Sequence, residues 1–508
     1  MTPIAQWTVF ETTFHSRAAY ENPFQDVMLR VRFYGPGAPQ VIDAFWDGGS
    51  TWRVRFSPTE PGTWEWQTTC SNEADAGLHG QSGRFECVPY QGDNVLYQHG
   101  PLKLSANRRF LEHADGTPFF WLADTAWNGV LHAQTEDWAH YLALRQQQRF
   151  TAIQFVSTQW RASTLGDREG QLAFEGAERI SLNPAFFQRA DPLVEAINAR
   201  GLMAAPVMLW TLTEIDPGQT LIEADAIRLA RYLAARWGAY QVVWLLGGDG
   251  HYEGQKADRW RRIGRAVFGD RHDRLVTMHP CGVSWVGDEF RGELWFDFIG
   301  YQSGHGDSDE HIRWLVQGPP AQSWSDEPPL PVINLEPNYE GHPAYQSGAR
   351  FSDYQVRRAA YWSLLVSPPA GVTYGNNEIW MWREDSGPAE NHPNIGIVQP
   401  WTAGVETIGI AHMTVLRAFF EQIRWTELEP ASGLLRQQPG DEDPSRFITA
   451  AQTHDGTQVV AYLPLGGAAE VVGSFSRARR FDPRTGQWSD VEIGQAAPDG
   501  EDWLLVLE

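Results

Sequence analysis

The stretch Pro331-Val-Ile-Asn-Leu-Glu-Pro-Asn-Tyr-Glu340 decides the fold, because it ends a short apolar run with a carboxylate and a proline. Its apolar residues show no alternation with polar ones, which is typical of a parallel strand covered on both faces. Pro337 has no N–H to donate to a β-ladder, so strand pairing should stop there. The stretch therefore predicts a buried strand that carries Glu336 at its carboxyl end.

A second stretch, Gln241-Val-Val-Trp-Leu-Leu-Gly-Gly-Asp-Gly250, has the same pattern. Its apolar run leads to Gly247 and Gly248, which allow the backbone to turn sharply or to be approached closely, and then to Asp249. Two carboxylates at two strand tips of one sheet are typical of a glycosidase pair. Another chemistry on a barrel and a purely structural ion pair remain open alternatives at this point.

Length and composition limit the possible organisation. A chain of 508 residues is too long for one hydrophobic core, and about 100 to 200 residues per domain predicts three domains. The formal charge of −23 repels phosphate backbones and anionic headgroups, so neither nucleic acid nor a membrane surface is expected as a partner. The 24 tryptophans fit either β-rich cores or platforms on which sugar rings stack.

The location of the protein is predicted from what the sequence lacks. The start of the chain has no basic segment followed by an apolar one, and no 18 apolar residues run together, so we expect a cytoplasmic protein. Cys70, Cys87 and Cys281 have no metal-ligand spacing, and they fit buried thiols in a reducing compartment. A pairing of Cys70 with Cys87 across neighbouring strands stays open. We expect no metal and no cofactor.

Residues 1–92 are predicted to form an N-terminal β-sandwich. Their short runs alternate apolar with polar residues between clusters of turn-forming residues. The expected strands are 8–14, 27–34, 51–56, 62–69 and 83–88. Trp46 and Trp52 are assigned to the core of this sandwich, with a reach of Trp46 over the cleft of the next domain as the alternative.

Residues 93–425 change to an alternation of strands and helices. The expected strands are 119–123, 151–156, 203–209, 242–246, 275–278, 296–300, 332–335 and 371–374, with helices such as 136–148, 224–237 and 258–268 between them. Eight such units predict a (β/α)8 TIM barrel of the α/β class, whose sites lie at the carboxyl ends of its strands. A doubly wound sheet is the main rival, but no glycine-rich phosphate loop follows the first strand.

Residues 426–508 return to short strands, expected at 447–452, 458–463, 470–473 and 503–507. Turn sequences separate them, which predicts a C-terminal β-sandwich. The fold class is therefore α/β plus all-β, with the barrel between two β-domains.

By strand count, Asp249 follows the fourth barrel strand and Glu336 the seventh, so their side chains can converge across the barrel mouth. Hydrolysis of an acetal needs one group that protonates the leaving oxygen and another that attacks the anomeric carbon, which two carboxylates supply without a metal. For a retaining enzyme we expect the two carboxyl groups to lie about 5 to 5.5 Å apart. We further expect Asp249 to be protonated in the free enzyme, and Glu336 to stay ionised because Tyr301 or His279 donates to it.

Several long motifs span the barrel region. They are Phe120-Trp-Leu-Ala-Asp-Thr-Ala-Trp127, Tyr141-Leu-Ala-Leu-Arg145, Ala152-Ile-Gln154, Trp244-Leu-Leu-Gly-Gly-Asp249, Asn334-Leu-Glu-Pro-Asn-Tyr-Glu-Gly341 and Ala370-Gly-Val-Thr-Tyr-Gly-Asn376. Through these motifs the middle of the chain resembles the apiosidase-like barrels of glycoside hydrolase family 140. The resemblance implies a retaining glycosidase of clan A, with Asp249 matching the acid/base and Glu336 the nucleophile.

The flanking domains also have resemblances. The first ninety residues look like a β-sandwich of unknown function that often precedes such barrels. The tail, with Phe481-Asp-Pro-Arg-Thr-Gly486, is similar to a sandwich that relatives carry as a collagen-binding-like domain. We interpret the tail as structural support, because a small acidic sandwich packed beside a barrel, in a chain without an export signal, has little access to collagen.

Further strand-tip residues are predicted to bind substrate. They are Asp124, Trp127, Trp160, Trp210, His279, Tyr301, Gln302, His305, Tyr339, Tyr374 and Asn376. Asp124 has a helix cap as its alternative role, and His279 a purely structural one. Glu340 lies in a loop beyond Pro337, which predicts a supporting role rather than catalysis.

The sequence thus favours an exo-acting retaining glycoside hydrolase on oligosaccharides or plant-type glycosides. The alternative is a non-catalytic carbohydrate-binding or scaffold protein on a barrel, which would be free to lose Asp249 or Glu336, yet both stand within intact motifs. An esterase is not supported, because no Gly-x-Ser-x-Gly elbow is present. For an exo-acting enzyme we expect loops, with Trp46 as an optional contributor, to close one end of the cleft into a pocket.

Overall fold

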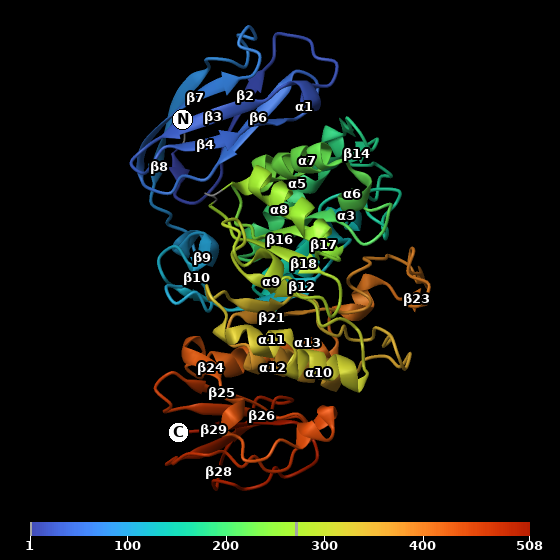
Figure 1. The fold of residues 1–508 in the computed structure, drawn as a ribbon. Coiled ribbons are helices and arrows are strands. Elements are labelled where there is room, and N and C mark those ends of the chain that lie inside the picture. Colours follow the sequence, from blue (N-terminus) through green and yellow to red (C-terminus); the bar gives the residue numbers. More distant parts are fainter. Residues whose placement is uncertain (1–2, 270–272) are drawn as a thin grey trace.

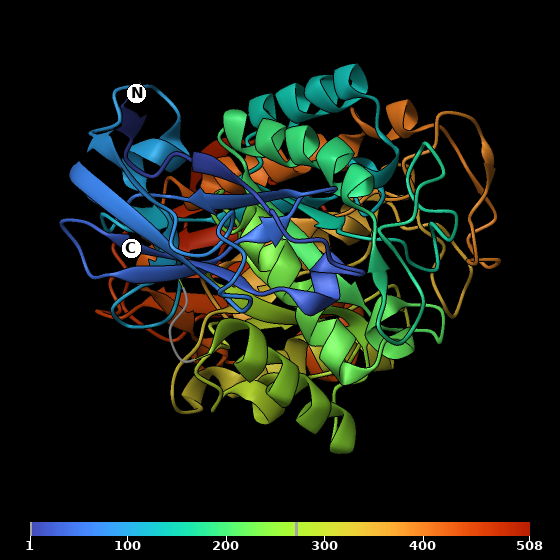
Figure 2. The same cartoon turned by 90° about the horizontal axis from the view of Figure 1, so that it is seen from above.

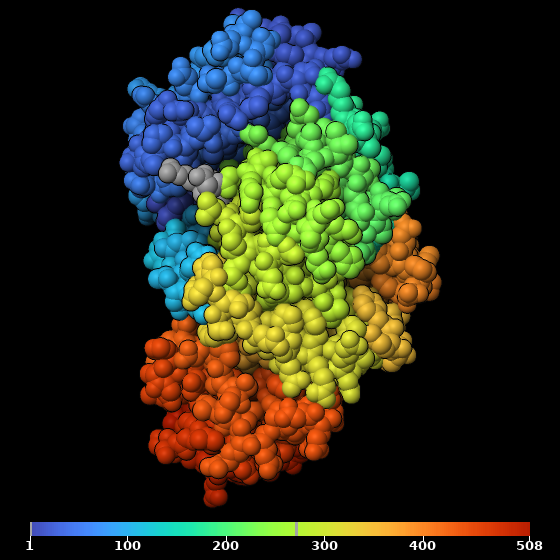
Figure 3. Space-filling view, viewed as in Figure 1, coloured from blue at the N-terminus to red at the C-terminus, as the bar shows by residue number. Residues whose placement is uncertain are grey.

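A computed structural model describes residues 3–269 and 273–508 of the chain, which form three parts stacked along one axis (Figures 1 and 3). The N-terminal β-domain lies at one end, the barrel in the middle and the C-terminal β-domain at the other end. Seen from above, the N-terminal domain covers one side of the barrel (Figure 2). The three-part order and the α/β plus all-β class agree with the sequence prediction.

The N-terminal sandwich consists of two sheets with strand orders β1-β8-β7-β3-β4 and β2-β6-β5. The elements are β1 Ile4–Ala5, β2 Phe10–His15, α1 Pro23–Asp26, β3 Leu29–Tyr34, β4 Gln40–Asp43, β5 Phe45–Trp46, β6 Thr51–Phe56, β7 Gly62–Cys70 and β8 Ser82–Val88. Buried and exposed residues alternate along β3, as the sequence pattern predicts. Stacked rings join the sheets, with centroids 4.0 Å apart for Phe10 and Phe85 and 4.1 Å apart for Phe33 and Phe56. Cys70 and Cys87 are buried free thiols.

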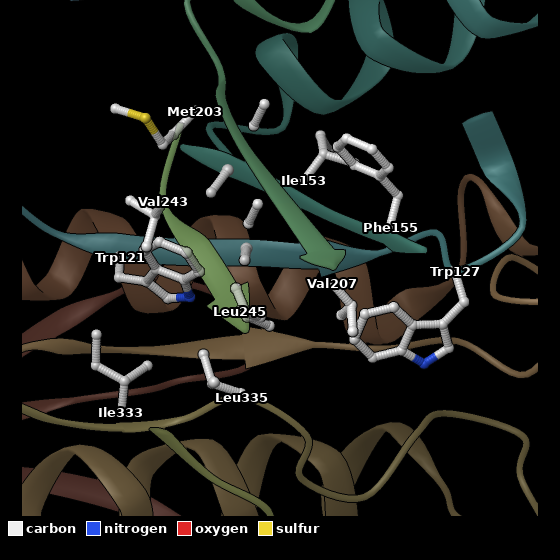
Figure 4. Packing of buried hydrophobic residues seen from close by; sticks show 14 of the residues in the cluster. Trp121, Trp127, Ile153, Phe155, Met203, Val207, Val243, Leu245, Ile333 and Leu335 are labelled. Atoms are coloured by element: carbon white, nitrogen blue, oxygen red, sulfur yellow. The ribbon is translucent and has the colours of Figure 1, made fainter. Parts of the chain in front are cut away.

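The barrel is one eight-stranded parallel sheet with the order β18-β17-β16-β13-β12-β21-β20-β19. Its strands are β12 Trp121–Thr125, β13 Ala152–Val156, β16 Met203–Trp210, β17 Trp244–Gly250, β18 Val276–Pro280, β19 Ile299–Tyr301, β20 Val332–Asn334 and β21 Gly371–Tyr374. All residues of these strands are buried, which explains why they lack apolar–polar alternation. Figure 4 shows apolar side chains such as Ile153, Val207 and Leu245 packed among the strands, with Trp127 beyond the strand ends.

The sheet closes between its two edge strands, β18 and β19. The Asp297 N–H donates to the carbonyl of Val276 at 2.9 Å. The Thr277 hydroxyl donates to the carbonyl of Phe298 at 2.6 Å and accepts from the Gly300 N–H at 3.0 Å. These bonds bring the two edges together, so that the carboxyl ends of all eight strands meet at one mouth.

Helices surround the sheet. The longer ones are α4 Thr135–Gln147, α5 Pro184–Ala199, α7 Glu223–Trp237, α8 Gln255–Phe268, α10 Asp309–Gln317, α12 Asp353–Val366 and α13 Ile408–Phe420. Shorter elements are α2 Val95–His99, β9 Leu102–Leu104, β10 Leu111–His113, β11 Pro118–Phe119, α3 Gly129–His132, β14 Phe174–Glu175, β15 Ser181–Leu182, α6 Pro217–Thr220, α9 Gly287–Phe290, α11 Pro319–Gln322, β22 Gly387–Pro388 and β23 Ile397–Val398. No helix within the described part of the chain is long and apolar enough to cross a membrane.

The C-terminal domain is a six-stranded antiparallel sheet with the order β24-β25-β26-β29-β27-β28. Its strands are β24 Leu428–Pro430, β25 Thr449–Thr453, β26 Val459–Leu463, β27 Ala478–Phe481, β28 Trp488–Val491 and β29 Trp503–Leu507. One face packs on the barrel helices, where Tyr462 stacks on Tyr361 of α12 with centroids 5.0 Å apart. Irregular segments that include Leu434 and Val471 cover the other face. The expected strand 470–473 makes only an isolated bridge, between Val471 and Leu435.

A buried charge network fixes the N-terminal sandwich to the barrel. Arg236 of α7 donates to both oxygens of Asp191 on α5 at 2.8 Å, and Arg55 of β6 donates to the same carboxylate at 2.6 Å. Burial by itself would raise the pKa of Asp191, but the two guanidiniums hold it below its usual value. Because one carboxylate compensates two buried cations from different domains, Asp191 is the central residue of this interface.

We predict that Asp191→Asn destabilises the protein by about 3 kcal/mol or more, because it leaves two buried guanidiniums without their shared counter-charge. Thermal or urea unfolding measures this loss. Asp43→Asn is the matched control, since Asp43 pairs with Arg231 of α7 across the same interface at 2.6 Å, but both side chains are partly exposed. It should cost less than about 1 kcal/mol. Equal costs for the two variants would contradict a central role for Asp191.

Candidate active site

Asp249 lies near the carboxyl end of β17 with a positive φ of 48°, which is uncommon for a residue other than glycine. The two preceding glycines are required by packing. A Cβ on Gly248 would lie 2.5 Å from a methyl group of Val207, and one on Gly247 would lie 2.5 Å from the hydroxyl of Tyr252. The close approach of Val207 and Tyr252 to the backbone therefore explains the two glycines. Their small size lets β17 pack tightly against its neighbours just before Asp249.

Two side chains hold the Asp249 carboxylate from different loops. Arg161 donates to Oδ2 at 2.9 Å, and Gln302 donates to Oδ1 at 3.3 Å. The Nε of Arg161 also lies 3.1 Å from Nε2 of His392. Sequence reasoning identified Gln302 but missed Arg161. The sequence did contain a signal for Arg161, because this residue directly follows Trp160 in the loop after the second barrel strand.

Glu336 lies two residues beyond β20, and its carboxylate is buried between two histidines. His305 Nε2 lies 2.9 Å from Oε1, and His279 Nε2 lies 3.4 Å from Oε2. The backbone N–H of Tyr339 donates to Nδ1 of His305 at 3.4 Å, so the proton of His305 is on Nε2 and is donated to Glu336. Burial lowers the pKa of His305 to about 3, so this histidine is neutral at pH 7.

The burial of Glu336 opposes its expected ionisation. Burial raises its pKa to about 7, with His279 lowering it and the charge of Asp249 raising it further. Of the two expected donors, His279 lies beside Glu336, at 3.4 Å from Oε2, whereas Tyr301 does not, and His305 bonds to Oε1 as well.

Both carboxylates line one cavity of about 60 Å³ at the barrel mouth. The predicted residues that line it with them are Trp127, Trp160, Trp210, Gln302, His305 and Tyr339. The lining residues that were not predicted are Arg161, His342, Tyr345, Trp380, His392 and Ile395. The residues come from the loops after at least six of the barrel strands, so the cavity exists only when the barrel is closed.

The aromatic walls of the cavity support one another. The ring of Trp210 lies between those of Trp160 and Trp127, at centroid distances of 4.4 Å and 5.2 Å. The indole N–H of Trp127 donates to the Tyr339 hydroxyl at 3.1 Å. The hydroxyl proton of Tyr339 is then free for Glu336, whose pKa this tyrosine lowers. The three tryptophan rings and Tyr339 therefore form one connected aromatic wall.

Asp124 and Tyr301 do not reach the cavity. Asp124 is fully buried in an ion pair with Arg145 of α4, and it accepts a hydrogen bond from Tyr141 at 2.6 Å. The Tyr301 ring points outward and packs near Trp314 of α10, with centroids 5.9 Å apart. Both side chains join the sheet to its helices rather than face the mouth.

Tyr374 and Asn376 are not at the cavity either. Tyr374 donates to Glu340 at 2.5 Å, and Asn376 donates to the Tyr374 hydroxyl at 3.3 Å. Glu340 also accepts from Thr407 at 2.6 Å and from the Gly409 N–H at 3.1 Å. This network fixes the loop that follows Glu336, which is the supporting role expected of Glu340.

Trp46 lies on the outside of the barrel, where its carbonyl accepts from Tyr232 of α7 at 3.0 Å. It lines a larger hollow of about 470 Å³ between the sandwich and α7. That hollow is lined by no strand-tip carboxylate, so the small cavity at the mouth is the candidate active site. Among the described residues, no group of three or more His, Cys, Asp or Glu side chains could hold a metal ion.

Comparison with known families agrees with this geometry. Residues 105–427 match the model of the apiosidase-like catalytic domain. The chain belongs to this family. Residues 3–71 match a domain of unknown function, DUF5060, and no curated protein matches the chain.

Solved structures share the fold of this apiosidase-like chain. A glycoside hydrolase family 5 protein from Bacteroides vulgatus aligns with a TM-score of 0.71 and 21% identity, over 81% of this chain and 94% of its own. A candidate glycoside hydrolase from the same strain aligns with a TM-score of 0.72 and 18% identity, over 100% of this chain and 99% of its own. At these identities the likeness establishes a common fold, including both flanking β-domains for the second structure.

The raised pKa of Glu336 predicts a stability gain for Glu336→Gln that depends on pH. In the wild type, the unfolded carboxyl ionises above about pH 4.5 but the folded one only near pH 7, so folding stability falls as pH rises through this window. The variant avoids this loss. Its melting temperature should exceed that of the wild type by a few degrees at pH 8 and by almost nothing at pH 4.

Glu340→Gln serves as the matched control for this measurement. Glu340 accepts from Tyr374, Thr407 and the Gly409 N–H, so its replacement should lower the melting temperature. An unchanged melting temperature for Glu336→Gln at pH 8, or an equal rise for Glu340→Gln, would contradict a free-energy cost specific to the burial of Glu336.

Proposed function

We propose that this apiosidase-like chain is a retaining glycoside hydrolase in which Glu336 is the nucleophile and Asp249 the acid/base. The observation that carries the proposal is the shared cavity, in which the two carboxylates follow the fourth and seventh barrel strands. In this mechanism Asp249 protonates the leaving oxygen while Glu336 attacks the anomeric carbon. Asp249 then removes a proton from the water that hydrolyses the glycosyl-enzyme.

Each neighbouring side chain has a task in this proposal. His305 donates to one oxygen of Glu336, which orients the other oxygen for attack. Arg161 and Gln302 hold Asp249 in place. Since Asp249 must carry a proton to act as an acid, binding of the substrate has to weaken its ion pair with Arg161. Trp127, Trp160 and Trp210 provide flat faces against which a sugar ring stacks.

The enclosure of the two carboxylates supports exo action. Asp249 and Glu336 are only 8% and 7% exposed, and the contacting rings of Trp160, Trp210 and Trp127 wall the cavity beside them, which favours a chain end over the middle of a polymer. Oligosaccharides and plant-type glycosides fit this requirement. With an oligosaccharide substrate, the first product should be a monosaccharide, and chromatography at early times detects it.

The assignment of roles predicts two different kinds of mutant. Glu336→Ala should abolish turnover of every substrate, because no glycosyl-enzyme forms. Asp249→Ala should slow cleavage of alkyl glycosides by about 10² to 10⁴-fold, yet spare the first step for aryl glycosides, whose leaving group needs no proton. Azide should restore the second step in Asp249→Ala and give a glycosyl azide of retained configuration.

Product configuration, read by NMR, tests these roles. Azide with Glu336→Ala should give the inverted adduct from an aryl glycoside, because azide enters from the side of the missing carboxylate. If Asp249→Ala instead gave the inverted adduct and Glu336→Ala the retained one, the two roles would be reversed.

The pH dependence of activity should follow Glu336. Since its pKa is raised to about 7 in the free enzyme, kcat/KM should fall as pH decreases through about 7, where the nucleophile gains a proton. His279 lowers the pKa of Glu336, so His279→Asn should move this fall to higher pH. An unchanged acid limb in His279→Asn would mean that another group controls it.

A further inference from the structure

The position of the glycone decides where a leaving group must lie. The cavity at the barrel mouth holds Asp249 and Glu336, the two carboxylates between which the glycone has to bind. If the glycone fills it, as the proposed function requires, the leaving group projects past the cavity to the loops at the barrel mouth. The chemistry of those loops then selects the leaving group.

Four of these loops expose a large apolar side chain. Leu165 follows β13, Ile215 follows β16, Tyr345 follows β20 and Ile397 lies on β23 after β21. Their exposed fractions are 79%, 55%, 62% and 52%. A single exposed apolar residue is ordinary on a protein surface, but apolar side chains gathered around a cavity are typical of a binding site.

Hydrogen bonds tie these loops to the walls of the cavity. The Tyr345 N–H donates to the carbonyl of His305 at 2.9 Å, and Tyr345 itself lines the cavity. The Arg161 N–H donates to Asp216, the neighbour of Ile215, at 2.9 Å. Asn391 donates to the carbonyl of Arg161 at 2.6 Å.

Leu165 and Ile397 are also placed near the cavity by contacts of their loops. The Thr164 N–H donates to Glu390 at 2.9 Å, which joins the loop of Leu165 to the segment that leads to Ile397. Ile395, two residues before Ile397, lines the cavity. The four side chains therefore stand on loops that surround one opening, and we call them the apolar rim.

We propose that the apolar rim of Leu165, Ile215, Tyr345 and Ile397 binds an apolar aglycone, so that the preferred substrates are glycosides of hydrophobic alcohols or phenols rather than oligosaccharides. This inference rests on the proposed function and names the leaving-group class of the same site. Of the four rim residues, Tyr345 is the one that also lines the cavity with the two carboxylates, and it provides a flat face there. The three aliphatic side chains offer contact area but no hydrogen bonds, which favours a hydrocarbon over a second sugar.

The test compares hexyl with methyl glycosides of the common pentoses and hexoses, because the two alcohols have similar leaving-group chemistry and differ in apolar area. For the glycone that the enzyme accepts, the hexyl glycoside should have at least about tenfold higher kcat/KM than the methyl glycoside. Tyr345→Ser and Leu165→Ser should each reduce this ratio severalfold. Leu294→Ser is the matched control, because Leu294 is 72% exposed but precedes β19 at the opposite end of the barrel.

Binding to the inactive Glu336→Gln variant separates this inference from the proposed function. Calorimetry with the same glycoside pair should again favour the hexyl compound about tenfold, whether or not the wild type cleaves it. Equal affinity for the pair, or binding of neither compound, would overturn the apolar rim. An equal fall of the hexyl-to-methyl ratio of kcat/KM in Leu294→Ser and in Tyr345→Ser would also overturn it. So would a disaccharide of the same glycone with a higher kcat/KM than the hexyl glycoside. Binding without turnover in the wild type would overturn only the proposed hydrolysis.

Discussion

The closure of the parallel sheet between β18 and β19 is the constraint on which the site depends. Thr277 bridges the two edge strands through its hydroxyl, and the backbone of Asp297 bonds to Val276. Because all eight strands run in the same direction, closing the sheet brings their carboxyl ends to one mouth. Asp249 and Glu336, 87 positions apart in the chain, line the same cavity for this reason.

The loops at the barrel mouth enclose Glu336 and thereby change its pKa. Taking Glu336 out of water raises its pKa to about 7, while His305 and His279 contact its two oxygens. Such a carboxyl group lowers folding stability above neutral pH, so the rest of the molecule has to compensate for it. The two flanking β-domains pack on the outer helices, and buried ion pairs of Arg55 with Asp191 and of Arg357 with Asp502 join them to the barrel.

The sequence predicted the fold more completely than the site. All eight barrel strands were anticipated, because buried parallel strands appear as continuous apolar runs between helical patterns. Short strands such as β1, β5 and β28 were missed, since two to four residues carry little periodicity. Among the predicted binding residues, Trp127, Gln302 and His305 line the cavity, but Asp124, Tyr301, Tyr374 and Asn376 lie elsewhere.

These outcomes have one physical cause. Position after a strand is local information, so the sequence by itself determined that Asp249 and Glu336 stand at strand tips and that the central domain is a closed barrel. The direction of a side chain at a strand tip depends on one residue of register, since alternate side chains point to opposite faces of the sheet. Only the tertiary structure decided that Tyr301 turns toward α10, that Arg161 pairs with Asp249 and that burial raises the pKa of Glu336. Each of these depends on contacts between residues far apart in the chain, which no local pattern contains.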